Sequence, residues 1–268
     1  MSSPLRAIFR LTLYLSLTFT LLPLQVIALR FSTKLAVRLP IFYHSLCTRV
    51  LGFQVRTHGT WEVDEPTLFA CNHTSYTDIT ILGGLLPASF IAKSEVASWP
   101  LFGLLAKLQR TVFVDRLASR ASLQREQMTA RLEAGESLIF FPEGTSSDGN
   151  VVLPFKSALF SVAQAQPNGK PVVVRPVSVA YSRLDGMPVG RALRPYVAWY
   201  GNMTLVPHLW EIAGLGRITV DVIFHPTATL ADLGSRKALA NHCHNLVARG
   251  VALANAGRID RLKEFSRS

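Results

Sequence analysis

The spacing of hydrophobic residues changes near residue 55 of this chain. From there on, short apolar runs alternate with stretches of helical pattern. Strands are predicted at residues 67–71, 90–92, 111–114, 137–141, 172–180 and 218–224. Helices are predicted between and after them, at residues 78–86, 100–108, 119–133, 156–165 and 235–254. Several of the strands are continuous apolar runs, as strands buried on both faces are. This alternation predicts an α/β fold with a mostly parallel central sheet flanked by helices.

The N-terminal segment predicts a pair of membrane-anchoring helices. Residues 11–29 carry no charge, and a run of 19 such residues is close to the length that spans a bilayer. The stretch 33–51 is amphipathic, and Arg30, Lys34 and Arg38 recur at intervals of four along it. Either the first helix spans the bilayer and the second lies on its surface, or both lie in the interface as a monotopic anchor. A cleaved signal peptide is disfavoured because no small-residue cleavage site follows the apolar run.

Charge supports a membrane location for this segment. The net charge is +11, and 17% of the residues are charged, against about a quarter in a soluble protein. The first acidic residue is Glu62, so residues 1–60 alone contribute +7. A basic, apolar segment suits an anionic membrane surface, whereas nucleic-acid binding would gather the basic residues in a polar patch. More basic residues follow the apolar run than precede it, which favours a cytoplasmic location for the rest of the chain. We therefore expect a membrane anchor at 1–54 and one folded domain at 55–268.

The three cysteines, Cys47, Cys71 and Cys243, stand far apart, without the spacing of a disulfide framework or a metal site. Isolated thiols are typical of a reducing compartment. His242 and His244 flank Cys243 in a predicted helix. Adjacent residues of a helix point in different directions, so we expect no metal site there.

A first polar block follows the strand predicted at 67–71, and it reads Asn72-His73-Thr74-Ser75-Tyr76-Thr77-Asp78. In open α/β sheets, functional sites form at the carboxyl ends of strands. A carboxylate bonded to one imidazole nitrogen would fix the tautomer of His73 and leave its other nitrogen free as a base. The alternative is that Asp78 stabilises the start of a helix while His73 is a loop histidine with satisfied hydrogen bonds. From this block alone, both interpretations stay open.

Three further blocks lie at or within predicted strands. The turn Phe140-Phe141-Pro142-Glu143-Gly144-Thr145 could hold the Glu143 carboxylate against a hydroxyl or a cation, or it could be an ordinary turn. Asp115 and Arg116 end the strand at 111–114 and could bind a polar head group, or could form a surface ion pair. Arg175 interrupts the apolar strand at 172–180, where a structural partner is favoured over a catalytic role.

The four blocks, in this order, resemble the signature of the glycerolipid acyltransferases, the family of the lysophosphatidic acid acyltransferases. That signature is Asn-His-x4-Asp, then Phe-Val/Ile-Asp-Arg, then Phe-Pro-Glu-Gly-Thr, then a hydrophobic strand with a proline. The similarity covers residues 55–230, and the N-terminal anchor fits it as well. A serine hydrolase is disfavoured because the sequence contains no Gly-x-Ser-x-Gly elbow. A catalytically inactive lipid-binding protein of this fold would be expected to lack His73 or Asp78, and both are present.

The resemblance implies an α/β acyltransferase that moves a fatty acyl chain directly, without an acyl-enzyme. His73 would be the general base that deprotonates the acceptor hydroxyl, and Asp78 would orient and stabilise it. The hydroxyl would attack the thioester of acyl-CoA or of acyl carrier protein. No metal or organic cofactor and no nucleic acid is implied. Six further residues would bind the substrate: Asn72, Asp115, Arg116, Glu143, Gly144 and Thr145.

One position departs from the lysophosphatidic acid acyltransferases. Most of them carry an Arg directly after Phe-Pro-Glu-Gly-Thr that helps to bind the acceptor phosphate, and this residue is Ser146 here. The stretches 91–114 and 141–150 are most similar to bacterial lyso-ornithine lipid O-acyltransferases. That resemblance implies lyso-ornithine lipid, whose head group has a carboxylate and an ammonium but no phosphate, as the acceptor. Lysophosphatidic acid stays the alternative, alone or as a second acceptor. The bacterial inner membrane is the expected location, with the catalytic domain on its cytoplasmic face.

Overall fold

In the computed structural model, which describes residues 2–61, 65–115 and 121–261, eight strands form one sheet. They are β1 (Phe53–His58), β2 (Thr67–Cys71), β3 (Ala88–Lys93), β4 (Val112–Val114), β5 (Ser137–Phe140), β6 (Val173–Leu184), β7 (Met187–Pro188) and β8 (Ile218–Phe224). Their order is β1-β8-β6-β2-β5-β3-β4, with β7 beside β6. The pairs are parallel except where β6 meets β8 and β7. The predicted mostly parallel sheet is confirmed.

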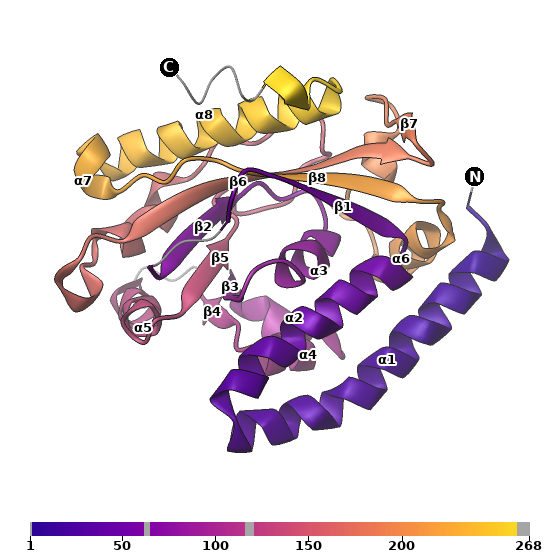
Figure 1. Ribbon diagram of the computed structural model, residues 1–268, viewed down its shortest axis with the longest axis horizontal. Coiled ribbons are helices and arrows are strands. Elements are labelled where there is room, and N and C mark those ends of the chain that lie inside the picture. The colour runs from indigo at the N-terminus through magenta and orange to yellow at the C-terminus, as the bar shows by residue number, and fades with distance from the viewer. Residues whose placement is uncertain (1, 62–64, 116–120, 262–268) are drawn as a thin grey trace.

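Helices cover both faces of the sheet (Figure 1). They are α1 (Pro4–Phe31), α2 (Thr33–Val50), α3 (Thr77–Gly83), α4 (Phe102–Leu108), α5 (Ala121–Glu133), α6 (Leu205–Gly214), α7 (Leu230–Leu233) and α8 (Arg236–Asn255). One apolar core lies between the sheet and α1, α2, α3 and α6. On the other face, α5, α8 and the 3₁₀ helix η3 (Ser157–Gln164) bury a second core. The flanked sheet therefore has the layers expected from the hydrophobic pattern.

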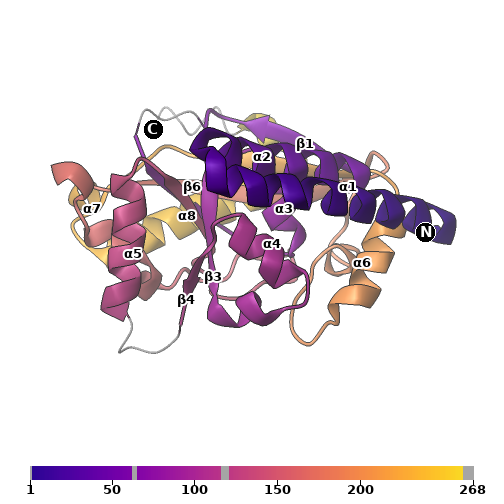
Figure 2. The ribbon, with the colours of Figure 1, turned by 90° about the horizontal axis from the view of Figure 1, so that it is seen from below.

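Helices α1 and α2 form a hairpin joined at Ser32, and Figure 2 shows them lying side by side across the domain. The hairpin is tied to the domain near both ends of α1. At the start, the Ser3 N–H donates to Gly214 O, 2.8 Å away. Towards the other end, Gln25 Nε2 donates to Leu108 O at 2.9 Å. The hairpin is thus packed along the domain rather than extended away from it.

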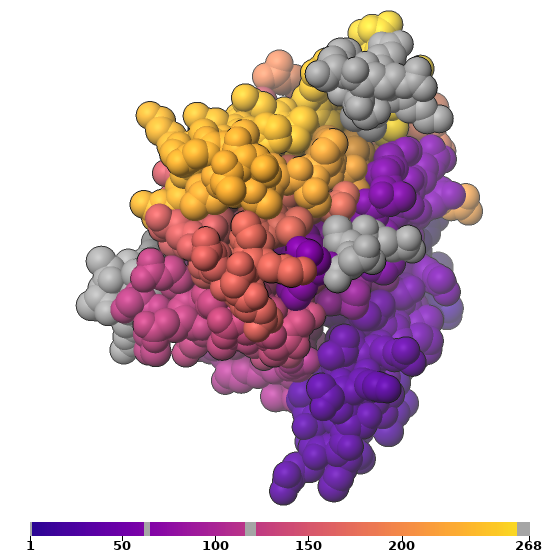
Figure 3. Space-filling view, turned by 60° about the vertical axis from the view of Figure 1, so that its left-hand side comes forward, coloured from indigo at the N-terminus to yellow at the C-terminus, as the bar shows by residue number. Residues whose placement is uncertain are grey.

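The outer side of the hairpin is apolar and exposed. Helix α1 is long and apolar enough to cross a membrane, by length and composition. In the space-filling view the indigo and purple hairpin forms a ridge at the lower right of the molecule (Figure 3). Its exposed apolar side chains include Leu5, Phe9, Phe19, Ile27, Phe31 and Phe42. A ridge of this composition is suited to contact with lipid.

Some elements differ from those predicted. Strand β1 and helix α6 were not predicted from the hydrophobic pattern, and residues 156–165 form the 3₁₀ helix η3 instead of an α-helix. Strand β1 starts at Phe53, so the sheet begins slightly before the expected domain start at 55. Strand β6 runs on to Leu184 because its partner β8 continues beside it as far as Ile218.

Candidate active site

The turn that follows β2 is fixed at its first residue by the side chain of Asn72. This side chain is buried, and it bonds the backbone of Val179 in the neighbouring strand β6. Asn72 Nδ2 donates to Val179 O at 2.9 Å, and the Val179 N–H donates to Asn72 Oδ1 at 2.7 Å. The amide therefore extends the pairing of β2 with β6 by one residue. Asn72 was predicted to bind substrate, and in the structure both ends of its amide hold the turn.

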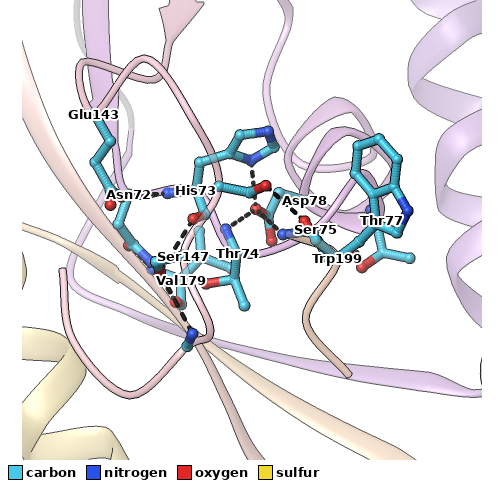
Figure 4. A network of polar contacts seen from close by, with 12 residues as sticks. Asn72, His73, Thr74, Ser75, Thr77, Asp78, Glu143, Ser147, Val179 and Trp199 are labelled. Carbon is cyan, nitrogen blue, oxygen red and sulfur yellow. Dashed lines mark hydrogen bonds and ion pairs between the residues drawn. The ribbon is translucent and has the colours of Figure 1, made fainter. Parts of the chain in front are cut away.

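His73 and Asp78 are brought together by this turn (Figure 4). His73 Nδ1 lies 2.8 Å from Asp78 Oδ2, and the Asp78 side chain is completely buried. The same oxygen accepts the N–H groups of Thr74 at 2.7 Å and Ser75 at 3.0 Å. The other oxygen accepts the hydroxyl of Tyr181 at 2.6 Å. Asp78 thus combines the two roles that the sequence left open: it stabilises the turn into α3, and it also orients His73.

The bond to Asp78 decides which nitrogen of His73 is available. Because Nδ1–H donates to the carboxylate, the neutral ring carries its proton on Nδ1, and Nε2 is free to act as a base. Nε2 makes no hydrogen bond to any residue that the structure describes. The ring stacks on Phe141 with centroids 4.1 Å apart, and the side chain is 20% exposed. A base held by packing on one side and by a buried carboxylate on the other can meet a substrate at Nε2.

Glu143, in the turn after β5, holds the His73 backbone by a hydrogen bond. Its carboxylate is buried and accepts the His73 N–H at 2.7 Å and the Leu153 N–H at 2.8 Å. Burial raises the pKa of Glu143 to about 8, although the two N–H donors act in the opposite direction. Gly144 follows with φ +70°, and a Cβ there would lie 2.9 Å from Lys156 Nζ. Glu143 was predicted to bind substrate, and the structure shows it positioning His73.

Replacing Glu143 by Gln is expected to remove a pH-dependent part of the stability. The folded-state pKa of about 8 lies above the ordinary value of 4.5, so this contribution is present at low pH and is lost as pH rises through about 8. The Tm of the wild type should therefore fall relative to that of Glu143→Gln between about pH 5 and pH 8.

The amide introduced by Glu143→Gln has a second effect. It turns an N–H group towards a backbone N–H, which makes the variant less stable than the wild type at low pH. Thermal unfolding measured against the exposed-site control Glu211→Gln tests this; a pH-independent difference in Tm would contradict it.

Two further loops close over the turn that carries His73. The Ser147 N–H donates to His73 O at 2.9 Å, so the segment after Gly144 is bonded to the same residue as Glu143. The Trp199 N–H donates to Thr74 O at 2.9 Å, and Ser146 Oγ donates to Trp199 O at 2.6 Å. Thr145, predicted to bind substrate, is exposed at this point. The backbone around His73 is therefore held from three sides.

Asp115, another predicted site residue, lies apart from this cluster. Asp115 follows β4, which is two strands beyond β5 in the sheet, and its carbonyl accepts Gln124 Nε2 at 3.3 Å. Arg116 lies outside the described residues. Arg175 donates from Nη1 to the carbonyls of Thr60 and His225, at 2.9 Å and 3.1 Å. Arg175 thus has structural partners of the kind that the sequence favours for it.

Comparison with known proteins identifies the family. A protein-family model described as Acyltransferase matches residues 53–180, from β1 into β6. The lyso-ornithine lipid O-acyltransferase of Brucella abortus is 42% identical over 247 residues, which cover 91% of this chain and 92% of that protein. This chain belongs to the acyltransferase family. The lyso-ornithine lipid O-acyltransferase of Rhizobium meliloti is 36% identical and covers 96% of this acyltransferase and 87% of its own length.

Other relatives of this acyltransferase have names that specify a different lipid substrate. The 1-acyl-sn-glycerol-3-phosphate acyltransferase of Neisseria gonorrhoeae is 34% identical over 69% of each chain. The crystal structure of the 1-acyl-sn-glycerophosphate acyltransferase of Thermotoga maritima matches with a TM-score of 0.62 at 21% identity. That match covers 92% of this chain and 96% of the other. The fold and the enzyme class expected from the sequence are thus confirmed.

An apolar cavity of about 140 Å³ lies near the candidate active site, between the hairpin and the domain. Phe90 lines it, and the Phe90 ring is 6.3 Å from Phe141, the ring that stacks on His73. The lining continues along α1 from Tyr14 to Gln25, a distance of about 16 Å at 1.5 Å per residue. A long apolar space that approaches the base in this way is suited to a fatty acyl chain.

Proposed function

We propose that this acyltransferase esterifies the hydroxyl of a lyso-ornithine lipid with a fatty acyl chain from a thioester donor. The observation that carries the proposal is the His73–Asp78 contact, with Nε2 unbonded and an apolar cavity that reaches Phe90, next to the Phe141 ring that stacks on His73. The names of the relatives in Brucella abortus and Rhizobium meliloti support the acceptor. Acyl-CoA and acyl carrier protein both present the required thioester, and either is a suitable donor.

The proposed reaction is one direct transfer. His73 Nε2 takes the proton of the acceptor hydroxyl while the oxygen attacks the thioester carbonyl. The tetrahedral intermediate collapses as the C–S bond breaks, leaving an ester and a thiolate that receives the proton from His73. Asp78 holds the ring in place and stabilises the imidazolium. Asn72 and Glu143 hold the backbone on both sides of the base, and the roles of Asp115, Arg116, Gly144 and Thr145 towards the substrate stay predictions.

We propose that residues 1–54 anchor the acyltransferase domain, 55–268, to the cytoplasmic face of the bacterial inner membrane. The exposed apolar side of the hairpin and its basic residues support this placement. The bonds of Ser3 and Gln25 to the domain favour a monotopic hairpin over a spanning helix. A helix held along the domain at both ends is suited to lie in one leaflet.

Ser146 bears on the choice of acceptor. In the structure Ser146 Oγ donates to Trp199 O, so the position that carries an Arg in phosphate-using relatives is occupied by a neutral bond to a loop. A second candidate acceptor is lysophosphatidic acid. It is supported by the relative in Neisseria gonorrhoeae and by Lys156, whose ammonium lies beside Gly144.

Membranes containing the enzyme, offered lyso-ornithine lipid and lysophosphatidic acid side by side, should acylate lyso-ornithine lipid preferentially. Ser146→Arg should shift the ratio towards lysophosphatidic acid by about ten- to a hundredfold, the value of one charge-assisted contact to phosphate. Ser146→Ala is the matched control, because it removes the bond to Trp199 without adding a cation. A wild-type enzyme that acylated lysophosphatidic acid and left lyso-ornithine lipid untouched would replace the proposed acceptor with the alternative.

A further inference from the structure

A crevice of about 650 Å³ lies where the N-terminal hairpin meets the edge of the sheet. Three arginines from different parts of the chain line it: Arg10 of α1, Arg49 of α2 and Arg217, which precedes β8. None of the described residues that line this crevice is acidic. Three guanidinium groups around one open space create a positive potential that attracts an anion. We name this space the arginine crevice.

Arg10 forms the rigid wall of the arginine crevice. Its Nη1 donates to Leu215 O at 2.8 Å and to Ala213 O at 3.2 Å, at the end of α6. Its guanidinium also lies against Gly52, where φ is +86° and where any side chain would collide with it. Arg10 therefore joins α1 to α6 and to the start of β1, and it cannot move away from the crevice without breaking these contacts.

Arg49 and Arg217 form the open side. Both side chains are exposed, and neither makes a hydrogen bond or an ion pair within the described part of the chain. One carboxylate lies nearby, that of Asp185, which accepts the backbone N–H of Arg217 at 2.7 Å and attracts Arg10. A single carboxylate balances one of the three guanidinium charges. The crevice keeps a net positive charge, and two of its guanidinium groups have all their donors free.

The crevice opens at the margin of the surface that faces lipid in the proposed placement. Leu35, Phe42 and Arg49 follow one another at intervals of seven on α2, so they lie on one face of that helix. Leu35 is 48% exposed and Phe42 is 53% exposed. On α1, Leu13 is 43% exposed and lies three residues after Arg10, so the two share one face of the helix. A basic side chain next to apolar side chains that enter a leaflet lies at the depth of the lipid phosphates.

We propose that the arginine crevice binds the phosphate of an anionic bilayer phospholipid, whose chains stay in the leaflet that holds the hairpin. Guanidinium groups match the oxygens of a phosphate and bind them in pairs. This site rests on the proposed membrane placement and is independent of the acyl-transfer reaction. Because Arg10 joins α1 to α6, the bound phosphate also holds the hairpin against the domain.

The test compares two pairs of charge-removing variants on vesicles of phosphatidylcholine with and without phosphatidylglycerol. Arg49→Gln with Arg217→Gln changes the crevice. Arg38→Gln with Arg56→Gln is the matched control, since it removes one charge from α2 and one from β1 outside the crevice. General attraction to an anionic surface is worth about fivefold in affinity for each basic residue, and both pairs lose it. The crevice pair should lose about ten- to a hundredfold more, because charge-assisted bonds to phosphate are lost as well.

Equal losses in the two pairs would overturn the proposal and leave only diffuse surface charge. Arg49→Lys with Arg217→Lys should bind with intermediate affinity, since the charge is kept and the paired geometry is lost. Thermal unfolding of the crevice variants should be unchanged, because neither side chain bonds to the described residues. His73→Ala should bind vesicles like the wild type, which separates this site from the proposed reaction. Inorganic phosphate that displaced the vesicles at the affinity of phosphatidylglycerol would show that the crevice takes a soluble anion, and the lipid assignment would fall.

Discussion

Replacing His73 by alanine is expected to lower the rate of acyl transfer by about 10²–10⁴, with the protein still folded and membrane-bound. His73 Nε2 is the position from which a base can reach the acceptor hydroxyl, since Nδ1 is bonded to Asp78. The ring packs on Phe141, but its side chain is partly exposed, so its removal leaves no large hole in the core. The turn itself is held by backbone bonds to Glu143 and Ser147 that alanine keeps.

The loss should appear with both candidate acceptors, because one base serves either hydroxyl. His242→Ala on α8 is a suitable control, since this half-buried histidine lies on a helix that packs against the opposite face of the sheet. Its turnover should match that of the wild type. A folded His73→Ala protein that turned over at nearly the wild-type rate would rule out the proposed general base.

The parts of the fold that the sequence predicted well are the buried strands. Strands β2 and β8 are buried at every position, and both are rich in apolar residues, although β8 also buries Thr219 and Asp221. Strand β1 escaped prediction because it lies at the edge of the sheet, where Gln54 and Arg56 face solvent. Its two apolar residues near the start, Phe53 and Val55, come directly after the helical pattern of α2. A one-dimensional pattern cannot separate such an edge strand from the end of a helix.

The site was predictable in its position but not in its bonding. His73, Asp78 and Glu143 all follow buried strands, and adjacent parallel strands bring such residues to one edge. The sequence could not show that Glu143 bonds the backbone N–H of His73, because any backbone N–H is a possible partner. Tyr181 was missed for a similar reason, since it lies 103 residues from Asp78 and meets it only through the pairing of β6 beside β2.

The two oxygens of Asp78 have different surroundings, and this difference decides what an amide would do there. Oδ2 receives three N–H donors, from His73, Thr74 and Ser75. Oδ1 receives the hydroxyl of Tyr181 alone. In Asp78→Asn the amide oxygen is therefore expected at the Oδ2 position, where it still accepts the Nδ1–H of His73. The tautomer is kept, and what is lost is the negative charge next to the ring.

Asp78→Asn should accordingly fold well and lose about 10²–10⁴ in kcat, because the imidazolium formed during transfer is no longer stabilised. Tyr181→Phe is the matched control. It removes the donor to Asp78 Oδ1 but keeps the carboxylate charge and its bond to His73, so most of the wild-type kcat should remain. Turnover measured on both variants decides the matter: an Asp78→Asn protein as active as Tyr181→Phe would show that Asp78 serves the turn alone and that its charge is not used in catalysis.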